Sequence, residues 1–465
     1  MHNKKEILLA FYGDDFTGST DALEFLSRAG AKTVLFLEPP TLELLEHFSD
    51  LDAIGVAGMT RSMRPNEMSE ELIKAFETLK SLKPRHIHYK VCSTFDSSPG
   101  IGNIGVAIDC GAQVFQNKYT SILVAAPNLG RFSAFGNLYA RMGIGSQGDI
   151  YRLDRHPSMR KHPITPSSES DLRMHLSKQT NQSIGLIDLV DLGKPLREIE
   201  SKLQAEIEKH SIVFFDAMYE EQMQIIGEVI DNTVVKGKAF FSVGSSGVEK
   251  AFGDFWEKEG ILKKRTSWGT LEQHLPMLVL SGSVSPITAE QIRYALSQGF
   301  EAVAITVDAL ESPEIEQEFI ENYQTLISNY LKLGKSVILH TAIGPEDDRV
   351  LQTKTFFQNK GLDELTIRSQ TAKRFGKILG QSALGALREV PVKRLVIAGG
   401  DTSSYVAREL GIKAVEMIAP VYTGAPMCRA FALNSPVDQI EVNLKGGQVG
   451  DETYFVALQK GEISI

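Results

Sequence analysis

Residues 7–21 read ILLAFYGDDFTGSTD: an apolar run, a glycine, two adjacent aspartates and a segment rich in hydroxyl side chains. The apolar run, which ends at turn residues, predicts a buried β-strand, and a helix is expected after the aspartates. A strand that turns directly into a helix is typical of open parallel α/β sheets, in which ligands bind at the carboxyl ends of the strands. The segment therefore predicts an α/β fold with Asp14 and Asp15 at the ligand-binding edge of a sheet.

The same alternation of short buried runs and longer helical segments continues along the chain. In the first half, further strands are expected at residues 33–37, 53–57, 86–91, 121–126, 184–189, 212–216 and 239–243. A second series is expected at residues 277–280, 302–306, 336–340, 395–398 and 414–417. Residues 256–276 are charged and lack a clear period, so they are interpreted as a connection. We therefore expect an α/β fold of two domains with mainly parallel sheets, residues 1–262 and 275–465.

The overall composition excludes several classes of protein. The chain has 465 residues, 42% of them hydrophobic and 23% charged, which is typical of a globular protein. A net charge of −9 argues against a nucleic-acid partner, because such proteins need a basic surface. The cysteines lie far apart, so neither a zinc site nor a disulfide framework is predicted: Cys92, Cys110 and Cys428. No secretory signal or membrane span is recognisable, and a cytoplasmic protein is expected.

The paired aspartates are candidates for proton transfer. Adjacent carboxylates repel each other, which tends to raise the pKa of one, and such a carboxylate can accept a proton from a substrate hydroxyl. The alternative is that Asp14 or Asp15 only caps the helix that follows. A phosphatase with an aspartyl nucleophile is disfavoured, because Gly13 stands where the first acid of its Asp-x-Asp-x-Thr pattern is needed.

Polar turns follow other predicted strands of the first half. Arg61 offers a planar fork suited to a carboxylate, Lys90 offers a point charge, and Ser93 offers a hydroxyl group. Together they are a candidate site for a polyhydroxy acid, although each type alone is more often a surface residue. Arg131, which follows a later strand, is a further candidate contact for an anion.

Two other segments of the first half have alternative interpretations. Residues 100–105 read GIGNIG, which matches a dinucleotide-binding fingerprint. The glycines begin several residues after the strand, and no acid for a ribose follows the next one, so a small anion near the helix expected from Asn103 is favoured. Residues 141–170 show little periodicity and are interpreted as an active-site flap or a plain surface excursion.

Small-residue turns in the second half are typical of nucleotide sites. Residues 281–285 read SGSVS, 399–403 read GGDTS and 445–447 read KGG. Glycine and hydroxyl residues at a helix start expose N–H groups to phosphate, although an ordinary capped helix is the alternative. Asp401 could hold Mg²⁺ through water, and Lys445 could neutralise phosphate charge. No Walker A sequence is present, because the GKS at 334–336 lacks the upstream glycine and precedes a strand.

Taken in order, these motifs resemble those of the four-carbon acid sugar kinase family over nearly the whole chain. They are GDDFTG (13–18), TRS (60–62), KxxST (90–94), APN (126–128), SGS (281–283), GGDTS (399–403) and KGG (445–447). The resemblance implies an ATP-dependent kinase that phosphorylates a hydroxyl of a four-carbon or related sugar acid. It also implies an N-terminal sugar-acid-binding domain, a C-terminal nucleotide-binding domain and an active-site cleft between them.

The resemblance also implies which residues bind each ligand. The substrate site would contain Asp14, Asp15, Arg61, Lys90, Val91, Cys92 and Ser93. The nucleotide site would contain Ser281, Ser283, Gly399, Gly400, Asp401, Thr402 and Gly447. Our hypothesis is that Asp15 is the general base, with Asp14 as a substrate hydrogen-bond partner, and these two roles are interchangeable at this stage. Arg61 and Lys90 are expected on the acid group, and Mg²⁺ is expected to bridge the ATP phosphates.

The chain departs from the usual family pattern Lys-x-Asp-Ser-Thr-Leu-Arg-Gly. Cys92 replaces the acid, Phe95 the leucine and Asp96 the arginine. The substrate therefore stays open among erythronate, threonate, 3-oxo-tetronate and a branched relative. The alternatives to a kinase are a metal-dependent hydrolase or lyase that uses the acidic turn, and a non-catalytic sensor of a sugar acid or nucleotide. A homodimer is an open alternative to a monomer.

Overall fold

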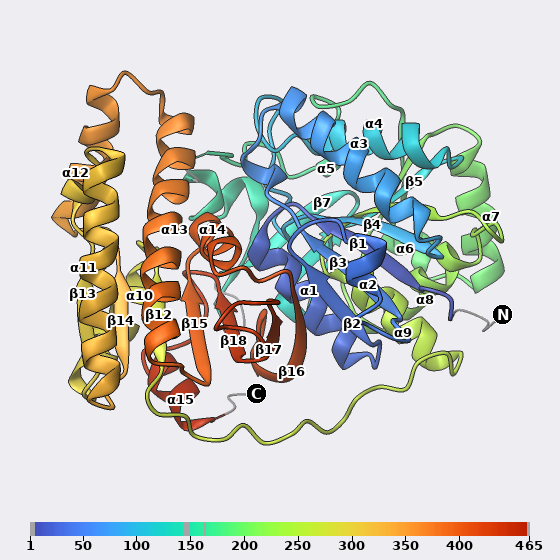
Figure 1. Cartoon of the computed structure of the whole chain (residues 1–465). Helices are drawn as coiled ribbons and strands as arrows, with labels where there is room; N and C mark the ends of the chain where they lie inside the picture. The colour runs from blue at the N-terminus through green and yellow to red at the C-terminus, as the bar shows by residue number, and fades with distance from the viewer. Residues whose placement is uncertain (1–4, 143–147, 162–163, 463–465) are drawn as a thin grey trace. The chain divides into compact units, whose positions relative to one another are not determined.

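The structure, a computed structural model, describes residues 5–142, 148–161 and 164–462. The chain divides into two compact units, one of Met1–Val34 and Glu38–Thr266, the other of Leu35–Leu37 and Ser267–Ile465. Both units are built from helices and mainly parallel strands (Figure 1). The α/β fold class predicted from the sequence is confirmed.

The first unit is organised around strands in the order β2-β3-β1-β4-β11-β5-β10-β9. Their bounds are β1 (Leu9–Gly13), β2 (Thr33–Phe36), β3 (Ala53–Ala57), β4 (His86–Lys90), β5 (Thr120–Leu123), β9 (Ile184–Ile187), β10 (Ile212–Phe215) and β11 (Phe240–Gly244). Each coincides with a strand expected from the sequence. β1 lies in the middle of this order, parallel to both β3 and β4. Because strands of this kind are buried on both faces, they appear in the sequence as continuous apolar runs.

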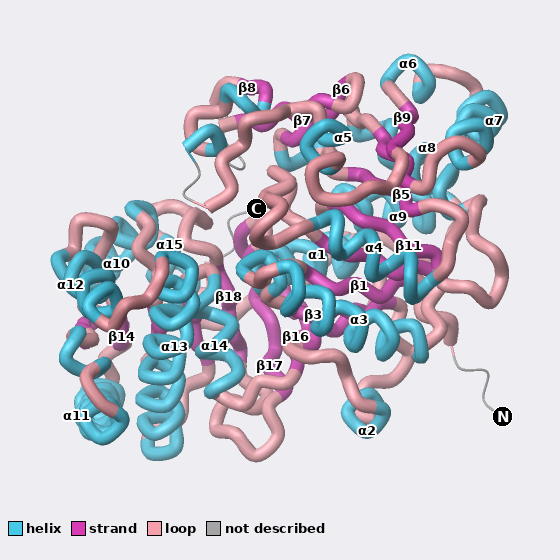
Figure 2. The backbone as a smooth tube through the Cα atoms, turned by 90° about the horizontal axis from the view of Figure 1, so that it is seen from above, coloured by secondary structure: helices cyan, strands magenta, loops and turns pink. Residues whose placement is uncertain are grey.

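Helices cover both faces of these strands. They are α1 (Phe16–Arg28), α2 (Leu42–Leu45), α3 (Pro65–Ser81), α4 (Ile104–Phe115), α5 (Leu172–Leu176), α6 (Leu189–Leu192), α7 (Leu196–Ile207), α8 (Glu220–Asp231) and α9 (Gly247–Lys258). α3 packs against α4 on one face, while α1 and α8 pack against α9 (Figure 1). In the view from above, α3 and α4 lie in front of the strands (Figure 2).

A small antiparallel sheet lies within the first unit and was not expected from the sequence. Its strands are β6 (Arg131–Ala134), β7 (Asn137–Arg141) and β8 (Ile150–Arg152). Residues 141–170, which show little periodicity in the sequence, contain β8 and the 3-10 turns Leu153–Arg155 and Met159–Lys161, and the choice between a flap and a surface excursion stays a prediction. Residues 143–147 and 162–163 of that segment lie outside the described residues. The three strands are short and pair with one another, so no single one carries a strong pattern.

The second unit has its strands in the order β13-β14-β12-β15-β18-β17-β16. The bounds are β12 (Leu278–Ser281), β13 (Glu301–Ala304), β14 (Val337–His340), β15 (Arg394–Ala398), β16 (Ala414–Tyr422), β17 (Ala425–Phe431) and β18 (Glu441–Lys445). The first five strands in this order run parallel, whereas β17 pairs antiparallel with both β18 and β16. β12 to β16 coincide with expected strands, while β17 and β18 were missed.

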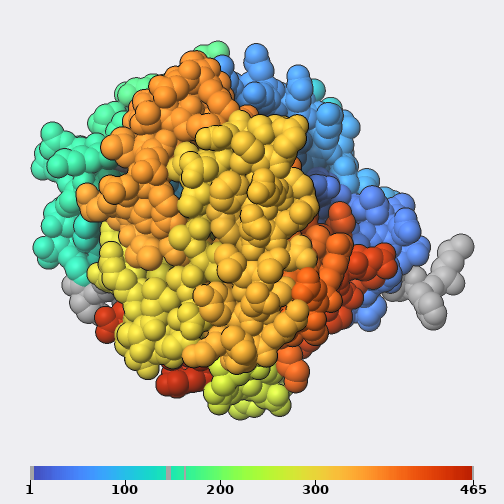
Figure 3. Space-filling view, turned by 60° about the vertical axis from the view of Figure 1, so that its left-hand side comes forward, coloured from blue at the N-terminus to red at the C-terminus, as the bar shows by residue number. Residues whose placement is uncertain are grey.

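The helices of the second unit form two groups. They are α10 (Pro286–Ser297), α11 (Pro313–Lys332), α12 (Asp348–Asn359), α13 (Glu364–Glu389), α14 (Asp401–Glu409) and α15 (Tyr454–Lys460). α10 and α15 share an apolar core with β12, β14 and β15. α13 packs against α11 and α14, and the yellow and orange surface in Figure 3 belongs to the region of α11, α12 and α13.

The segment between the two series of strands is shorter than the sequence indicated. Trp256 is fully buried in α9, where its ring stacks on Phe252, so it belongs to the first unit and not to the connection. No helix or strand lies between Lys258 and Leu278. Within the described ranges, no helix is both long enough and apolar enough to cross a membrane.

Candidate active site

Three loops meet at the carboxyl edge of the first unit, after the adjacent strands β3, β1 and β4. The backbone joins them directly: the Asp14 amide donates to the Lys90 carbonyl at 2.8 Å, and the Asp14 carbonyl accepts from the Arg61 amide at 2.9 Å. The Gly58 amide donates to the Gly13 carbonyl at 3.0 Å. Residues that are far apart in the sequence are thus brought into one site.

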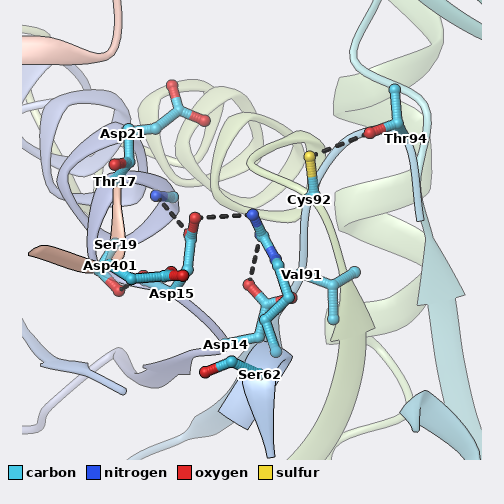
Figure 4. A network of polar contacts seen from close by, with 12 residues as sticks. Asp14, Asp15, Thr17, Ser19, Asp21, Ser62, Val91, Cys92, Thr94 and Asp401 are labelled. Atoms are coloured by element: carbon cyan, nitrogen blue, oxygen red, sulfur yellow. Dashed lines mark hydrogen bonds and ion pairs between the residues drawn. The ribbon is translucent and has the colours of Figure 1, made fainter. Parts of the chain in front are cut away.

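The two aspartates share one guanidinium group (Figure 4). Arg61 donates to Asp14 through Nη2 at 2.7 Å and through Nε at 3.1 Å, and to Asp15 through Nη1 at 2.6 Å. Charge-assisted bonds of this fork geometry are strong and fix orientation. Arg61 therefore holds both acids in place, a contact that the sequence did not reveal.

Burial makes the Asp14 carboxyl unusual. Burial raises its pKa, Arg61 opposes the rise and Asp15 adds to it, and the result is a pKa of about 6. For Arg61, burial lowers the pKa, but Asp14 and Asp15 more than compensate and hold it well above its ordinary value. The network can therefore gain or lose a proton at Asp14 near neutral pH while the guanidinium stays charged.

Asp15 is also the N-cap of α1, so the capping interpretation is correct for this residue. Its Oδ1 accepts a hydrogen bond from the Gly18 amide at 2.7 Å, while its Oδ2 faces Arg61. The Ser19 hydroxyl donates to the Asp15 carbonyl at 2.6 Å. Because one oxygen serves the helix and the other serves the guanidinium, the cap and the acidic pair are one structure.

The turn after β4 places the remaining predicted residues. Lys90 is buried, and its Nζ donates to the Val91 carbonyl at 3.0 Å and lies 3.9 Å from the Asp21 carboxylate, a neighbour that the sequence interpretation had not included. Burial is the largest cause that raises the pKa of Cys92 to about 11, so its thiol is neutral near pH 7, and it lies 3.1 Å from the Thr94 hydroxyl. Ser93 is half-buried in the same turn.

The glycine-rich segment at residues 100–105 has a different role from the one expected. α4 begins at Ile104, whose amide donates to the Gln179 side chain at 2.9 Å. The Val106 amide donates to the Asn103 side chain, also at 2.9 Å. Amide groups that were predicted to face a small anion are thus bound by the chain's own side chains.

In the second unit, three loops follow the adjacent parallel strands β12, β15 and β18. Ser281 ends β12, Gly399 follows β15, and Gly447 follows β18. The Gly399 amide donates to the Lys445 carbonyl at 3.0 Å, and the Gly282 amide donates to the Ala398 carbonyl at 2.9 Å. All seven residues predicted for the nucleotide thus lie at the carboxyl ends of neighbouring strands: Ser281 in β12 itself, Asp401 and Thr402 in the first turn of α14, and the others in the loops.

Glycine is required where these loops touch. A Cβ atom on Gly282 would come within 2.4 Å of the Thr402 side chain, and one on Gly447 within 2.7 Å of the Ser283 hydroxyl. Gly399 has a φ of 148°, which side-chain-bearing residues rarely adopt. Glycine thus allows the loops to approach one another closely.

Two buried serine hydroxyls and one buried lysine lie near the ends of these strands. The hydroxyls of Ser281 and Ser285 are buried without a hydrogen-bond partner among the described residues. Lys445 is also buried, and its Nζ contacts the Thr288 hydroxyl at 3.2 Å. Burial lowers the pKa of Lys445 to about 7. Hydroxyl donors and a buried cation suit a phosphate group, so the residue types present fit a nucleotide.

Asp401 does not have the surroundings expected of a metal ligand. Its carboxylate pairs with Arg368 at 3.0 Å at the start of α14. Across residues 5–142, 148–161 and 164–462, no three His, Cys, Asp or Glu side chains gather in a group that could hold a metal ion.

Comparisons with known proteins also divide the chain into two domains, one for a sugar and one for a nucleotide. Residues 9–252 match the model of a sugar-binding N-terminal domain, and residues 278–455 match that of a nucleotide-binding C-terminal domain. The 3-oxo-isoapionate kinase of Paraburkholderia graminis is 38% identical, and the match covers 98% of this chain and 95% of that protein. The 3-oxo-tetronate kinase of Salmonella typhimurium is 28% identical over 96% and 97% of the two chains. A Salmonella typhimurium crystal structure that is 24% identical has the same fold, with a TM-score of 0.73 and coverage of 98% and 99%.

Proposed function

The chain belongs to the four-carbon acid sugar kinase family, and from that premise we propose that its substrate is a 3-oxo sugar acid, with 3-oxo-isoapionate the first to test. That the chain is a kinase acting on a small sugar acid follows from relatives that match it from end to end. The choice of substrate is supported by the 38% identity to a 3-oxo-isoapionate kinase, against 28% to a 3-oxo-tetronate kinase. ATP is the phosphoryl donor that such kinases use.

We assign the acceptor hydroxyl to the acidic turn of the first unit. The observation that carries this assignment is the pair of carboxylates held by one guanidinium at the carboxyl edge of the strands. Asp15 is the more exposed acid, so it takes the proton of the hydroxyl, while Asp14 accepts a hydrogen bond from the substrate and keeps Arg61 in position. The turn from Lys90 to Ser93 contributes the remaining contacts to the sugar acid.

We assign the triphosphate to the loops of the second unit. Ser281, Ser283 and Gly447 would surround it together with residues 399–402, and Lys445 would add positive charge. The support is the pair of buried serine hydroxyls without partners among the described residues and the glycines that allow the loops to approach one another closely. ATP supplies the phosphoryl group, and we propose that Mg²⁺, when bound with it, would neutralise the charge of its phosphates.

The first experiment is an assay of ADP release with a series of four- and five-carbon sugar acids. We expect ADP to form only when a sugar acid is present, with the highest kcat/KM for 3-oxo-isoapionate. ADP formation without any acid would indicate a hydrolase, and binding of both ligands without ADP would indicate a sensor. A higher kcat/KM for a four-carbon acid would reject the substrate assignment alone.

The second experiment replaces Asp15 with Asn. Asparagine caps a helix about as well as aspartate, so the unfolding temperature should stay close to that of the wild type. An amide cannot take a proton from the hydroxyl, so kcat should fall by a factor of about 10² or more while the sugar acid still binds. Glu257→Gln, at an exposed position of α9, serves as the control. Turnover near the wild-type rate would remove Asp15 from the mechanism.

A further inference from the structure

Three buried polar atoms in the first unit have no hydrogen-bond partner in the part of the chain that the structure describes. They are Nε of Arg131, Oδ1 of Asp96 and Nε2 of His156. Arg131 begins β6, Asp96 lies in the turn after β4, and His156 follows the 3-10 turn Leu153–Arg155. Buried polar atoms in native proteins are nearly always hydrogen-bonded, so such a group indicates a place that something else occupies.

The Arg131 guanidinium is held on one side only. The residue is 6% exposed, and its Nη1 donates to the carbonyls of Leu129 and Gly130 at 3.2 Å and of Arg141 at 3.1 Å. No carboxylate of the described residues forms an ion pair with it. Burial lowers the pKa of Arg131, while Cys92 and Asp96 raise it, so both of these side chains lie within electrostatic range. A buried charge of this kind needs a partner.

The two cations expected on the acid group already have partners. Arg61 is neutralised by two carboxylates, those of Asp14 and Asp15. The Lys90 ammonium bonds to the Val91 carbonyl and lies 3.9 Å from the Asp21 carboxylate. Arg131 is therefore a buried cation near this turn that forms no ion pair within the described residues.

His156 and Asp96 supply one donor and one acceptor beside this cation. Nδ1 of His156 accepts from the amides of Ser158 and Met159, both at 3.3 Å, so the proton of the neutral ring is on Nε2. Burial lowers the pKa of His156 and Arg131 lowers it further, which places the ring near the guanidinium and keeps it neutral. Nε2 is therefore a donor, although it lies near the Arg141 carbonyl without a hydrogen bond of ordinary geometry. Oδ1 of Asp96 is an acceptor with no donor.

We propose that Arg131, with His156 and Asp96, forms the subsite for the carboxylate end of the sugar acid. The carboxylate accepts from Arg131 and His156, and the hydroxyl or hydrate group beside it donates to Asp96. Arg131, and not Arg61 or Lys90, then creates the requirement for an acid. This assignment rests on the proposed function, because it presupposes that a sugar acid binds at the carboxyl edge of the first unit.

The test compares the sugar acid with its amide, which has the same shape and no charge. The wild type and Arg131→Gln are assayed for ADP release with both ligands. With the acid, we expect Arg131→Gln to raise KM by about 10- to 100-fold, because a charge-assisted contact is lost. With the amide, the same substitution should change KM by less than about threefold, and KM for ATP should not change. Arg131→Lys, which keeps the charge, should recover part of the loss.

Two outcomes would overturn the proposal. An unchanged KM for the acid in Arg131→Gln would show that the carboxylate binds elsewhere. An equal rise for acid and amide would show that Arg131 only supports the fold. Arg173→Gln is the matched control, since Arg173 lies in the same unit and is paired with Asp171 at 2.7 Å, and its KM values should be those of the wild type.

A binding measurement separates this proposal from the proposed function. Calorimetry with the full chain and the sugar acid, without ATP, should show about tenfold weaker binding in Asp96→Ala and in Arg131→Lys than in the wild type. If the wild type releases no ADP with any sugar acid, the proposed function fails, but these affinities still decide the subsite. Equal affinities in the three proteins would reject the subsite even if the kinase activity is confirmed.

Discussion

Asp14 and Asp15 are neighbours in the sequence but have different surroundings. Asp14 is 3% exposed and binds Arg61 with both oxygens, whereas Asp15 divides its oxygens between Arg61 and the start of α1. The sequence predicted that one of two adjacent acids has a raised pKa, and this is confirmed for Asp14. It did not reveal that burial is the main cause, because burial depends on strands and helices distant along the chain.

The pKa of Asp14 predicts a pH dependence of activity. Above about pH 6 the carboxylate is charged and holds Arg61, whereas below that pH it becomes neutral and the network loses one ion pair. We expect kcat/KM for the sugar acid to fall about tenfold per unit as the pH drops below 6. The affinity for ATP, measured by calorimetry over the same range, is the control. A flat profile between pH 5 and 7, with the enzyme folded throughout, would contradict the assignment.

Glu249 predicts a pH dependence of stability. It is fully buried on α9, its Oε1 lies 3.6 Å from Nε2 of His88, and neither carboxylate oxygen has a hydrogen-bond partner in the described residues. Burial raises the pKa of Glu249 to about 8, against 4.5 for the ordinary group, even though Lys90 lowers it and Asp21 raises it only slightly. The folded protein therefore binds the proton more tightly than the unfolded chain does between these two values.

This difference between the folded and unfolded pKa of Glu249 decides whether stability rises or falls with pH. The contribution of Glu249 to stability is complete below about pH 4.5 and is lost as the pH rises to about 8, at roughly 1.4 kcal/mol per unit. Glu249→Gln should remove that slope, so the variant should become more stable than the wild type near pH 8 in urea unfolding. Glu257→Gln, exposed on the same helix, should keep the wild-type slope. Parallel stability curves for wild type and Glu249→Gln would contradict the prediction.

At the level of elements, strands that are continuous buried runs could be predicted, whereas β17, β18 and the short strands of the small sheet could not. Strands such as β1 and β3 are buried throughout, so their apolar pattern in the sequence is uninterrupted. β18 reads EVNLK, and its Asn443 is buried because its side chain bonds to the carbonyls of Ala425 and Pro426 and to the Tyr454 hydroxyl. Such polar residues look like a loop in the sequence, because the partners that satisfy them come from other elements.

The end of β18 predicts a residue that acts on the nucleotide. Lys445 ends β18, and its ammonium contacts the Thr288 hydroxyl on α10 and lies over the rings of Tyr454 and Phe455 on α15. Lys445→Met should raise KM for ATP by about 10- to 100-fold and leave KM for the sugar acid unchanged. Lys460→Met, at an exposed position of α15, is the control and should leave both KM values unchanged. A rise in KM for the sugar acid alone would show that Lys445 does not act on the nucleotide.

For the whole molecule, each ligand should leave its own pattern of protection from hydrogen exchange. A sugar acid alone should protect residues 13–18, 58–62 and 90–94, because these loops form one edge of the first unit. A non-hydrolysable ATP analogue alone should protect residues 281–285, 399–402 and 445–447. Protection of the acidic turn by the analogue alone would contradict the division of roles between the two units. Whether the chain is a homodimer stays a prediction, which light scattering tests.

The site as a whole was only partly readable from the sequence. The motifs marked the loops, because glycines and acids at strand ends stand out against apolar runs. Asp14 and Arg61 are 47 positions apart in the sequence, and neither of their motifs predicts that they pair. Likewise, Arg131 gives no signal that it forms no ion pair within the described residues, since that depends on which carboxylates the fold brings near.

The small sheet of β6, β7 and β8 lies apart from the parallel strands in its hydrogen bonding, and the carbonyl groups that grip Arg131 come from this sheet and the turn before it. The proposed subsite thus places the requirement for an acid in a different part of the chain from the acidic turn. We expect that changes in this small sheet alter which sugar acid binds while the acidic turn stays the same. Exchanging residues 127–142 between homologues would be the simplest way to watch such a transition in the laboratory.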